Sequence, residues 1–129
     1  MIVNTEGQDV LTGTVVIVED DDLMQSLMVE IFTDLGATCL AFITADDGLM
    51  YLMQSQVPCS LVVTDYTLPG QLDGRELAFM VRERWPNVPV IVTTGYGIEV
   101  GNDLPERVAF LQKPWSIQLM IETVRGILR

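Results

Sequence analysis

Four short segments of this sequence carry residue types that could transfer a phosphoryl group. Acids fill positions 19–22, Asp65 ends an apolar run, Thr93 and Thr94 end another, and Lys113 is the only lysine in the chain. A carboxylate can attack phosphorus and form an aspartyl phosphate. A hydroxyl and an ammonium group can hold the oxygens of the incoming phosphoryl group. The sequence therefore offers a nucleophile and its counter-charges, provided that the fold brings them together.

The acids require a cation if they share one site. Carboxylates a few ångströms apart repel each other by about 4 kcal/mol per pair at an effective dielectric constant near 20. Mg²⁺ is the expected ion, because it binds through one or two carboxylates, water and a phosphate oxygen. Acids at a helix N-terminus are also favourable without a metal. Such capping explains Asp21 and Asp22, but it does not explain Asp65, which ends a strand and precedes a loop.

The composition excludes several other kinds of chemistry. The chain has no histidine, which excludes histidine metal sites and catalysis by Ser-His-Asp or Cys-His groups. Its net charge of −11 disfavours binding to nucleic acid or to anionic membranes. No apolar run reaches the roughly 18 residues of a membrane span, and no signal-peptide pattern is present. We therefore expect a cytoplasmic protein.

Apolar runs alternate with segments of helical periodicity from residue 14 onward. Strands are predicted at 15–18, 38–43, 60–65, 88–94 and 108–112, and helices at 23–35, 44–55, 75–85 and 117–128. Strands that are apolar on both faces and alternate with helices predict an α/β fold with five parallel strands and five helices. Glycines and a proline in 95–105 predict that the remaining, fourth helix is short or irregular. Residues 1–13 lack a clear period and are predicted to be a leader or linker before a domain at 14–129.

The predicted topology concentrates the reactive residue types at one place. In an open parallel sheet, ligands bind at the carboxyl ends of the strands, near the point where the strand order reverses. The acids at 19–22, Asp65, Thr94 and Lys113 all lie at the ends of predicted strands. We therefore expect three acids, a hydroxyl and the lysine to converge on one rim of the sheet.

These segments also resemble a known family, the receiver domain of response regulators in two-component systems. The resemblance rests on five motifs in order, namely Val18-Glu19-Asp20-Asp21, Asp65-Tyr66-Thr67-Leu68-Pro69-Gly70, Asp73-Gly74, Thr94-Gly95 and Lys113-Pro114. It covers roughly residues 14–129. It implies a flavodoxin-like, doubly wound sheet with strand order 2-1-3-4-5. It also implies a cis peptide bond between Lys113 and Pro114.

The resemblance assigns a role to each site residue. Asp65 is expected to be the phosphoacceptor, and Thr94 and Lys113 are expected to bind the phosphoryl group. The implied Mg²⁺ ligands are Asp65, Asp20, the backbone carbonyl of Thr67 and, mainly through water, Glu19. Phe110 matches the aromatic residue that turns inward on phosphorylation. The implied partner is a histidine kinase or a histidine phosphotransfer protein in a phosphorelay, and the chain is expected to catalyse only its own phosphorylation.

Three features depart from the usual pattern of this family. One extra residue, Gln71 or Leu72, lengthens the loop after Pro69. The segment from Gly95 to Phe110 is shorter than usual, and Trp115 stands where phenylalanine is usual. The longer loop, the Gly-Tyr-Gly after Thr94 and the Leu-Gln-Lys-Pro-Trp ending at Trp115 resemble receivers attached to hybrid histidine kinases more than those of transcription factors.

Three other functions fit parts of the sequence. A Mg²⁺-dependent phosphatase of the haloacid dehalogenase type also uses an aspartate nucleophile, but it requires a second aspartate where Thr67 stands. A nucleotide-binding domain would require a glycine-rich loop after the first strand, where this chain has acids. A degenerate receiver would serve as an interaction module without phosphorylation. The complete set of Asp65, Thr94 and Lys113 favours the phosphoacceptor.

Overall fold

The computed structural model describes residues 2–5, 8–95 and 106–128, and its centre is a parallel sheet. The sheet has five strands in the order β4-β3-β5-β6-β7. These strands are β3 (Thr14–Val18), β4 (Thr38–Phe42), β5 (Cys59–Asp65), β6 (Val90–Thr94) and β7 (Val108–Gln112). All neighbouring pairs are parallel. The predicted strands and the predicted order 2-1-3-4-5 are therefore confirmed, with shifts of one or two residues at some strand ends.

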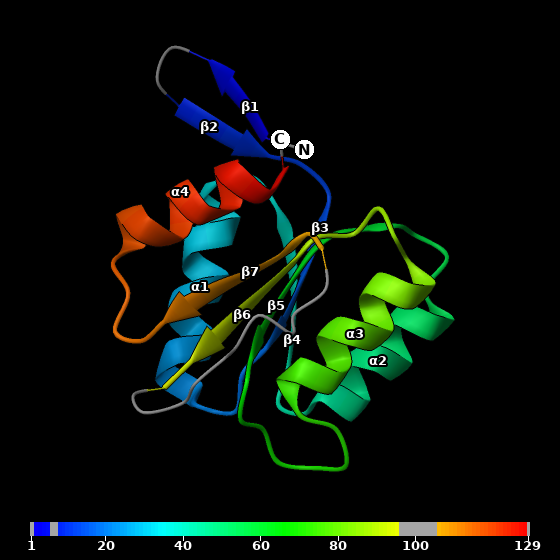
Figure 1. The fold of residues 1–129 in the computed structure, drawn as a ribbon. Coiled ribbons are helices and arrows are strands. Elements are labelled where there is room, and N and C mark those ends of the chain that lie inside the picture. Colours follow the sequence, from blue (N-terminus) through cyan, green and yellow to red (C-terminus); the bar gives the residue numbers. More distant parts are fainter. Residues whose placement is uncertain (1, 6–7, 96–105, 129) are drawn as a thin grey trace.

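Helices cover both faces of the sheet, as the apolar strands require. Figure 1 shows α1 (Asp22–Asp34) and α4 (Ile117–Leu128) on one face, and α2 (Ala45–Gln54) and α3 (Gly74–Arg84) on the other. Side chains alternate between the faces along a strand. Val15 and Ile17 of β3 accordingly pack in the core beneath α1 and α4, whereas Val16 and Val18 pack beneath α2 and α3. None of the described helices is long and apolar enough to cross a membrane.

Short polar side chains define where the helices begin. Asp21 caps α1 by accepting a hydrogen bond from the backbone N–H of Met24 at 2.9 Å, and Thr44 caps α2. Asp73 caps α3 in a reciprocal capping box with Glu76. The sequence predicted helix starts at 23, 44 and 75, so α1 and α3 start one residue earlier than predicted and α2 starts one residue later.

The predicted leader contains secondary structure. Strands β1 (Ile2–Thr5) and β2 (Gln8–Leu11) form an antiparallel hairpin where the sequence shows no clear period. Leu11 is completely buried in the core beneath α1 and α4, and its backbone N–H donates to the carbonyl of Leu35. The core therefore starts before residue 14, while the role of 1–13 as a leader stays a prediction. The expected irregular helix at 95–105 lies outside the described residues from 96 onward.

Candidate functional site

The sheet register places Glu19 beside Asp65. Val18 of β3 pairs with Thr64 of β5, so the residues that follow them lie at the same level of the rim. Glu19 is 1% exposed and Asp65 is 7% exposed. Two carboxylates are thus held at the carboxyl ends of the two central strands, where open parallel sheets bind ligands.

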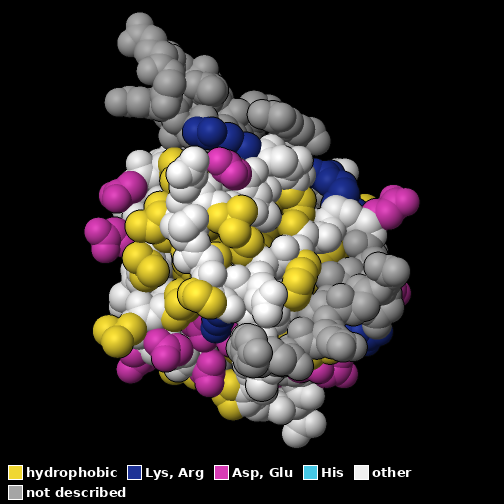
Figure 2. All heavy atoms as spheres, turned by 60° about the vertical axis from the view of Figure 1, so that its left-hand side comes forward, with side chains coloured by type: hydrophobic (Ala, Val, Ile, Leu, Met, Phe, Trp, Pro, Cys, Tyr) yellow, Lys and Arg dark blue, Asp and Glu magenta, His cyan; other side chains and the backbone are white. Residues whose placement is uncertain are grey.

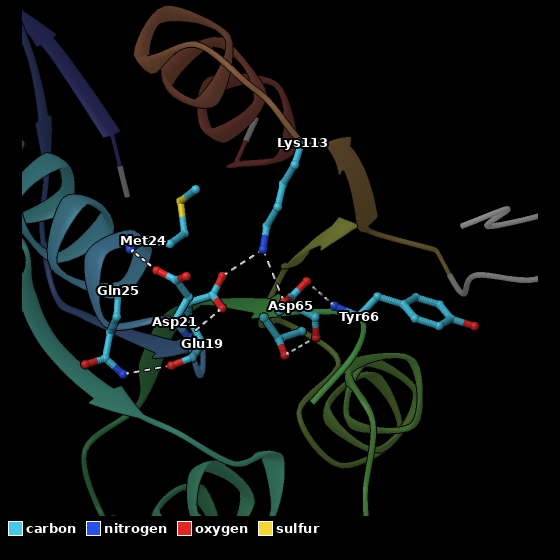
Figure 3. A network of polar contacts seen from close by, with 8 residues as sticks. Glu19, Asp21, Met24, Gln25, Asp65, Tyr66 and Lys113 are labelled. Atoms are coloured by element: carbon cyan, nitrogen blue, oxygen red, sulfur yellow. Dashed lines mark hydrogen bonds and ion pairs between the residues drawn. The ribbon is translucent and has the colours of Figure 1, made fainter. Parts of the chain in front are cut away.

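Lys113 reaches both carboxylates from the end of β7. Its backbone N–H donates to the carbonyl of Thr94 at 2.7 Å, which fixes the start of the side chain beside β6. Its ammonium Nζ lies 3.0 Å from Glu19 Oε1 and 3.2 Å from Asp65 Oδ2 (Figure 3). The peptide bond between Lys113 and Pro114 is cis, as predicted. The lysine therefore joins residues that are 94 and 48 positions away in the sequence.

Three acids form a cluster around this lysine. One carboxylate oxygen each from Glu19, Asp20 and Asp65 lies within 4.8 Å of the others. Glu19 and Asp65 are buried, whereas Asp20 is exposed, so the cluster opens to solvent on one side. Backbone N–H groups hold the buried pair, since Asp21 donates to Glu19 Oε2 at 3.1 Å and Tyr66 donates to Asp65 Oδ1 at 2.9 Å.

Burial makes the negative charges of this cluster costly. It raises the pKa of the Asp65 carboxyl, although Lys113 and the Tyr66 N–H lower it. Burial likewise raises the pKa of the Glu19 carboxyl, although the Asp21 N–H and Lys113 lower it. Burial lowers the pKa of the Lys113 ammonium, but Glu19 and Asp65 outweigh that effect and raise it. One ammonium is thus well stabilised, while the two buried carboxylates lack sufficient positive charge.

The cluster fits a divalent cation. Three carboxylates and one ammonium group have a formal charge of −2, which one divalent ion neutralises. All the clustered ligand atoms are oxygens, which Mg²⁺ prefers. The residues that would hold the ion are Glu19, Asp20 and Asp65. Thr67 lies in the exposed turn after Asp65, and its carbonyl as a further ligand stays a prediction.

Two threonines at the end of β6 carry unpaired hydroxyl groups. Thr93 and Thr94 are fully buried, and neither Oγ1 has a hydrogen-bond partner among the residues that the structure describes. A buried hydroxyl without a partner costs about 1–3 kcal/mol. Successive strand residues point to opposite faces, so the two hydroxyls point to different places. The sequence assigned phosphoryl binding to Thr94 alone, and Phe110, the predicted switch aromatic, is 40% exposed.

A comparison with protein families shows which family has this fold. The response regulator receiver domain family matches residues 15–125. The chain belongs to this family. The match covers the sheet from β3 to β7 and the residues of the acid cluster, in agreement with the resemblance read from the motifs.

Similar proteins place this receiver domain among response regulators. The hydrogenase transcriptional regulatory protein HoxA of Cupriavidus necator is 32% identical over 117 residues, which are 88% of this chain and 23% of HoxA. The regulator TorR of Escherichia coli O157:H7 is 30% identical over 88% of this chain and 49% of its own length. The crystal structure of the NtrX receiver domain from Brucella abortus is 28% identical, with a TM-score of 0.76, over 88% of this chain and 97% of that one.

The chain thus spans about a quarter to a half of the length of these curated relatives. HoxA and TorR are transcriptional regulatory proteins, and that activity belongs to those whole proteins. The resemblance of the present receiver domain to receivers of hybrid kinases stays a prediction.

Two residues that support the site were not predicted from the sequence. Gln25 of α1 donates from Nε2 to the carbonyls of Glu19 at 3.0 Å and Phe42 at 3.2 Å, which ties the acidic loop to the end of β4. Gly74 packs against Asp65, because a Cβ at residue 74 would lie 1.8 Å from the Asp65 carbonyl oxygen. Gly74 belongs to one of the five motifs of the resemblance, but neither residue type nor spacing marked Gln25.

Proposed function

We propose that this receiver domain accepts a phosphoryl group on Asp65, with Mg²⁺ bound by the acid cluster, and thereby changes its surface for a partner. The observation that carries the proposal is the ammonium of Lys113, shared between the Glu19 and Asp65 carboxylates at 3.0 and 3.2 Å. Such an arrangement holds a nucleophile, a cation-binding pair and a phosphate-binding cation in hydrogen-bond contact.

The chain's own residues account for most of the chemistry. An oxygen of Asp65 forms the new bond to phosphorus while the bond between phosphorus and the donor breaks, and the donor keeps that electron pair. Lys113 then exchanges its contact with Asp65 Oδ2 for a contact with a phosphoryl oxygen. When bound, Mg²⁺ supplies the positive charge that lets an anionic phosphoryl group approach an anionic carboxylate.

Thr94 connects the chemistry to the surface. Its buried hydroxyl has no partner among the described residues, so a phosphoryl oxygen would offer it a first acceptor. Movement of Thr94 toward that oxygen would pull on the end of β6, next to β7. Phe110 of β7 is 40% exposed and would be the group that changes its exposure.

The face formed by α1 and α4 is the proposed docking surface for a phosphodonor. Figure 2 shows hydrophobic side chains gathered on the side of the molecule that carries these helices. Leu23 is 84% exposed and Ile117 is 51% exposed. Leu23, Met24 and Leu27 line a hollow together with Lys113, so the apolar surface borders the site. We propose a helical histidine kinase or histidine phosphotransfer protein as the partner, in the cytoplasm.

Intact-protein mass spectrometry tests the proposal. Incubation with acetyl phosphate and Mg²⁺ should add the mass of one phosphoryl group, and chelation of the metal or the variant Asp65→Ala should abolish it. The neighbouring variant Asp73→Ala changes the same charge away from the acid cluster and should still be phosphorylated. Failure of the wild-type chain to gain mass from acetyl phosphate and from a phosphorylated histidine phosphotransfer protein would contradict the proposal.

A further inference from the structure

We propose that Asp46, in the first turn of α2, is a positioning residue for the loop that joins Asp65 to α3. That loop carries Thr67, whose carbonyl is the predicted ligand of the metal. The effect of Asp46 on Mg²⁺ binding rests on the function proposed above. Asp46 lies on α2, which covers the face of the sheet opposite α4, and none of the five motifs contains it.

The first observation is a pair of hydrogen bonds between α2 and the loop. Asp46 Oδ1 accepts from the backbone N–H of Gln71 at 3.0 Å and from that of Leu72 at 3.2 Å. One carboxylate oxygen thus binds two successive N–H groups that lie 25 and 26 positions further along the chain. The extra residue of the loop is Gln71 or Leu72, so Asp46 holds the added length.

The second observation is the glycine that precedes them. Gly70 has a φ of +101°, in the left-handed region that side chains rarely adopt. A Cβ at residue 70 would lie 2.7 Å from Asp46 Oδ1 and 3.6 Å from the Cβ of Thr44. Glycine is therefore required both for the turn and for the close approach of the loop to α2.

The loop is closed at its other end beside the phosphoacceptor. The Gly74 N–H donates to the carbonyl of Tyr66 at 2.8 Å, which brings the two ends of the loop together. Leu68 and Leu72 pack against the core beneath α2 and α3, whereas Thr67 is exposed. The backbone position of Thr67 therefore depends on contacts made by the rest of the loop, and Asp46 makes two of them.

Acids near a helix N-terminus are favourable in themselves, so the test must separate charge from position. Asp47 provides the matched control, because it lies in the same turn of α2 and is exposed. Asp46→Asn provides the conservative rescue, because an asparagine side-chain oxygen still accepts from two N–H groups. Asp46→Ala removes the acceptor.

Amide hydrogen exchange in the metal-free protein measures the anchor directly. In Asp46→Ala the amides of Gln71 and Leu72 should exchange about tenfold faster than in the wild type, whereas Asp46→Asn and Asp47→Ala should retain protection. Mg²⁺ titration followed by NMR should then show about tenfold weaker binding in Asp46→Ala, the size expected when a residue that orients a ligand is lost. Asp46→Asn should bind Mg²⁺ within about twofold of the wild type.

The remaining outcomes either overturn the role of Asp46 or distinguish it from the proposed function. Unchanged exchange at Gln71 and Leu72 in Asp46→Ala overturns the anchor, and faster exchange with unchanged Mg²⁺ binding overturns the positioning role. If the wild type binds no Mg²⁺, the proposed function fails while the exchange data still decide on the anchor. If Asp46→Ala does not fold, Gly70→Ala tests the same contact from the loop, and unchanged protection of Gln71 and Leu72 in that variant overturns it.

Discussion

Replacement of Lys113 by methionine should destabilise the metal-free protein, because it leaves two buried carboxylates unpaired. The ammonium lies 3.0 Å from Glu19 Oε1 and 3.2 Å from Asp65 Oδ2. Each contact corresponds to about 5 kcal/mol of Coulomb attraction at an effective dielectric constant near 20. The cost of removing all three charged groups from water offsets much of this attraction.

Removal of one partner from a buried ion pair typically costs about 3–5 kcal/mol. The Lys113 side chain is 23% exposed, so solvent screens part of the interaction and lowers the expected loss. We therefore expect Lys113→Met to lose about 2–3 kcal/mol of unfolding free energy without metal. Saturating Mg²⁺ should reduce this loss to less than about 1 kcal/mol, because the ion supplies positive charge to the same two carboxylates.

Urea unfolding with a chelator, and again with excess Mg²⁺, measures both values. Arg84→Met removes the same charge at an exposed position outside the acid cluster and controls for the change in net charge. Equal stability of the Lys113→Met and Arg84→Met variants without metal would show that Lys113 does not stabilise the two carboxylates. A difference between them that grows with Mg²⁺ would show that the ion does not replace the charge of Lys113.

Three further predictions follow from contacts around the acid cluster. Gly74→Ala would place a Cβ 1.8 Å from the Asp65 carbonyl oxygen and should lower the free energy of unfolding in urea by about 3 kcal/mol. The control Gly126→Ala lies in a helix with open space around it and should raise that free energy by about 0.5–1 kcal/mol. Thr94→Val should leave the metal-free protein at least as stable as the wild type in the same assay, but it should weaken the response to beryllofluoride in an NMR titration. Thr93→Val should have the same effect on stability as Thr94→Val and should keep the response to beryllofluoride. Burial raises the pKa of Asp65 in the folded state above its value in the unfolded state, so the folded state binds more protons in the pH range between the two pKa values. The stability of the wild type therefore falls as pH rises through this range. The stability advantage of metal-free Asp65→Asn over the wild type should shrink as pH is lowered through the same range, and an advantage that grows instead would contradict the raised pKa of Asp65.

The sequence predicted the sheet and the rim because both depend on patterns along the chain. Strands such as Thr14–Val18 are apolar on successive residues, which indicates burial on both faces, and the strand ends then bring Glu19, Asp65 and Lys113 together without any further information. The starts of α1 and α2 followed from Asp21 and Thr44, whose short side chains cap helices.

The contacts that support the site could not be predicted in this way. Gln25 and Asp46 are polar residues in amphipathic helices, where a solvent-exposed position is the ordinary expectation. Their roles arise from backbone groups of distant segments, the carbonyl of Phe42 and the N–H of Gln71, whose directions only the folded chain defines. The hairpin of Ile2–Thr5 and Gln8–Leu11 was missed because each strand has only four residues, the shortest run over which alternation can be recognised.

Identification of the modified residue is the most direct test of Asp65 as the phosphoacceptor. The wild-type chain is incubated with acetyl phosphate and Mg²⁺, reduced with borohydride to convert an acyl phosphate into an alcohol, and digested for peptide mass spectrometry. We predict homoserine at position 65 and at no other aspartate. Unmodified Asp65, or reduction at Asp20 or another acid in its place, would contradict the assignment of the nucleophile.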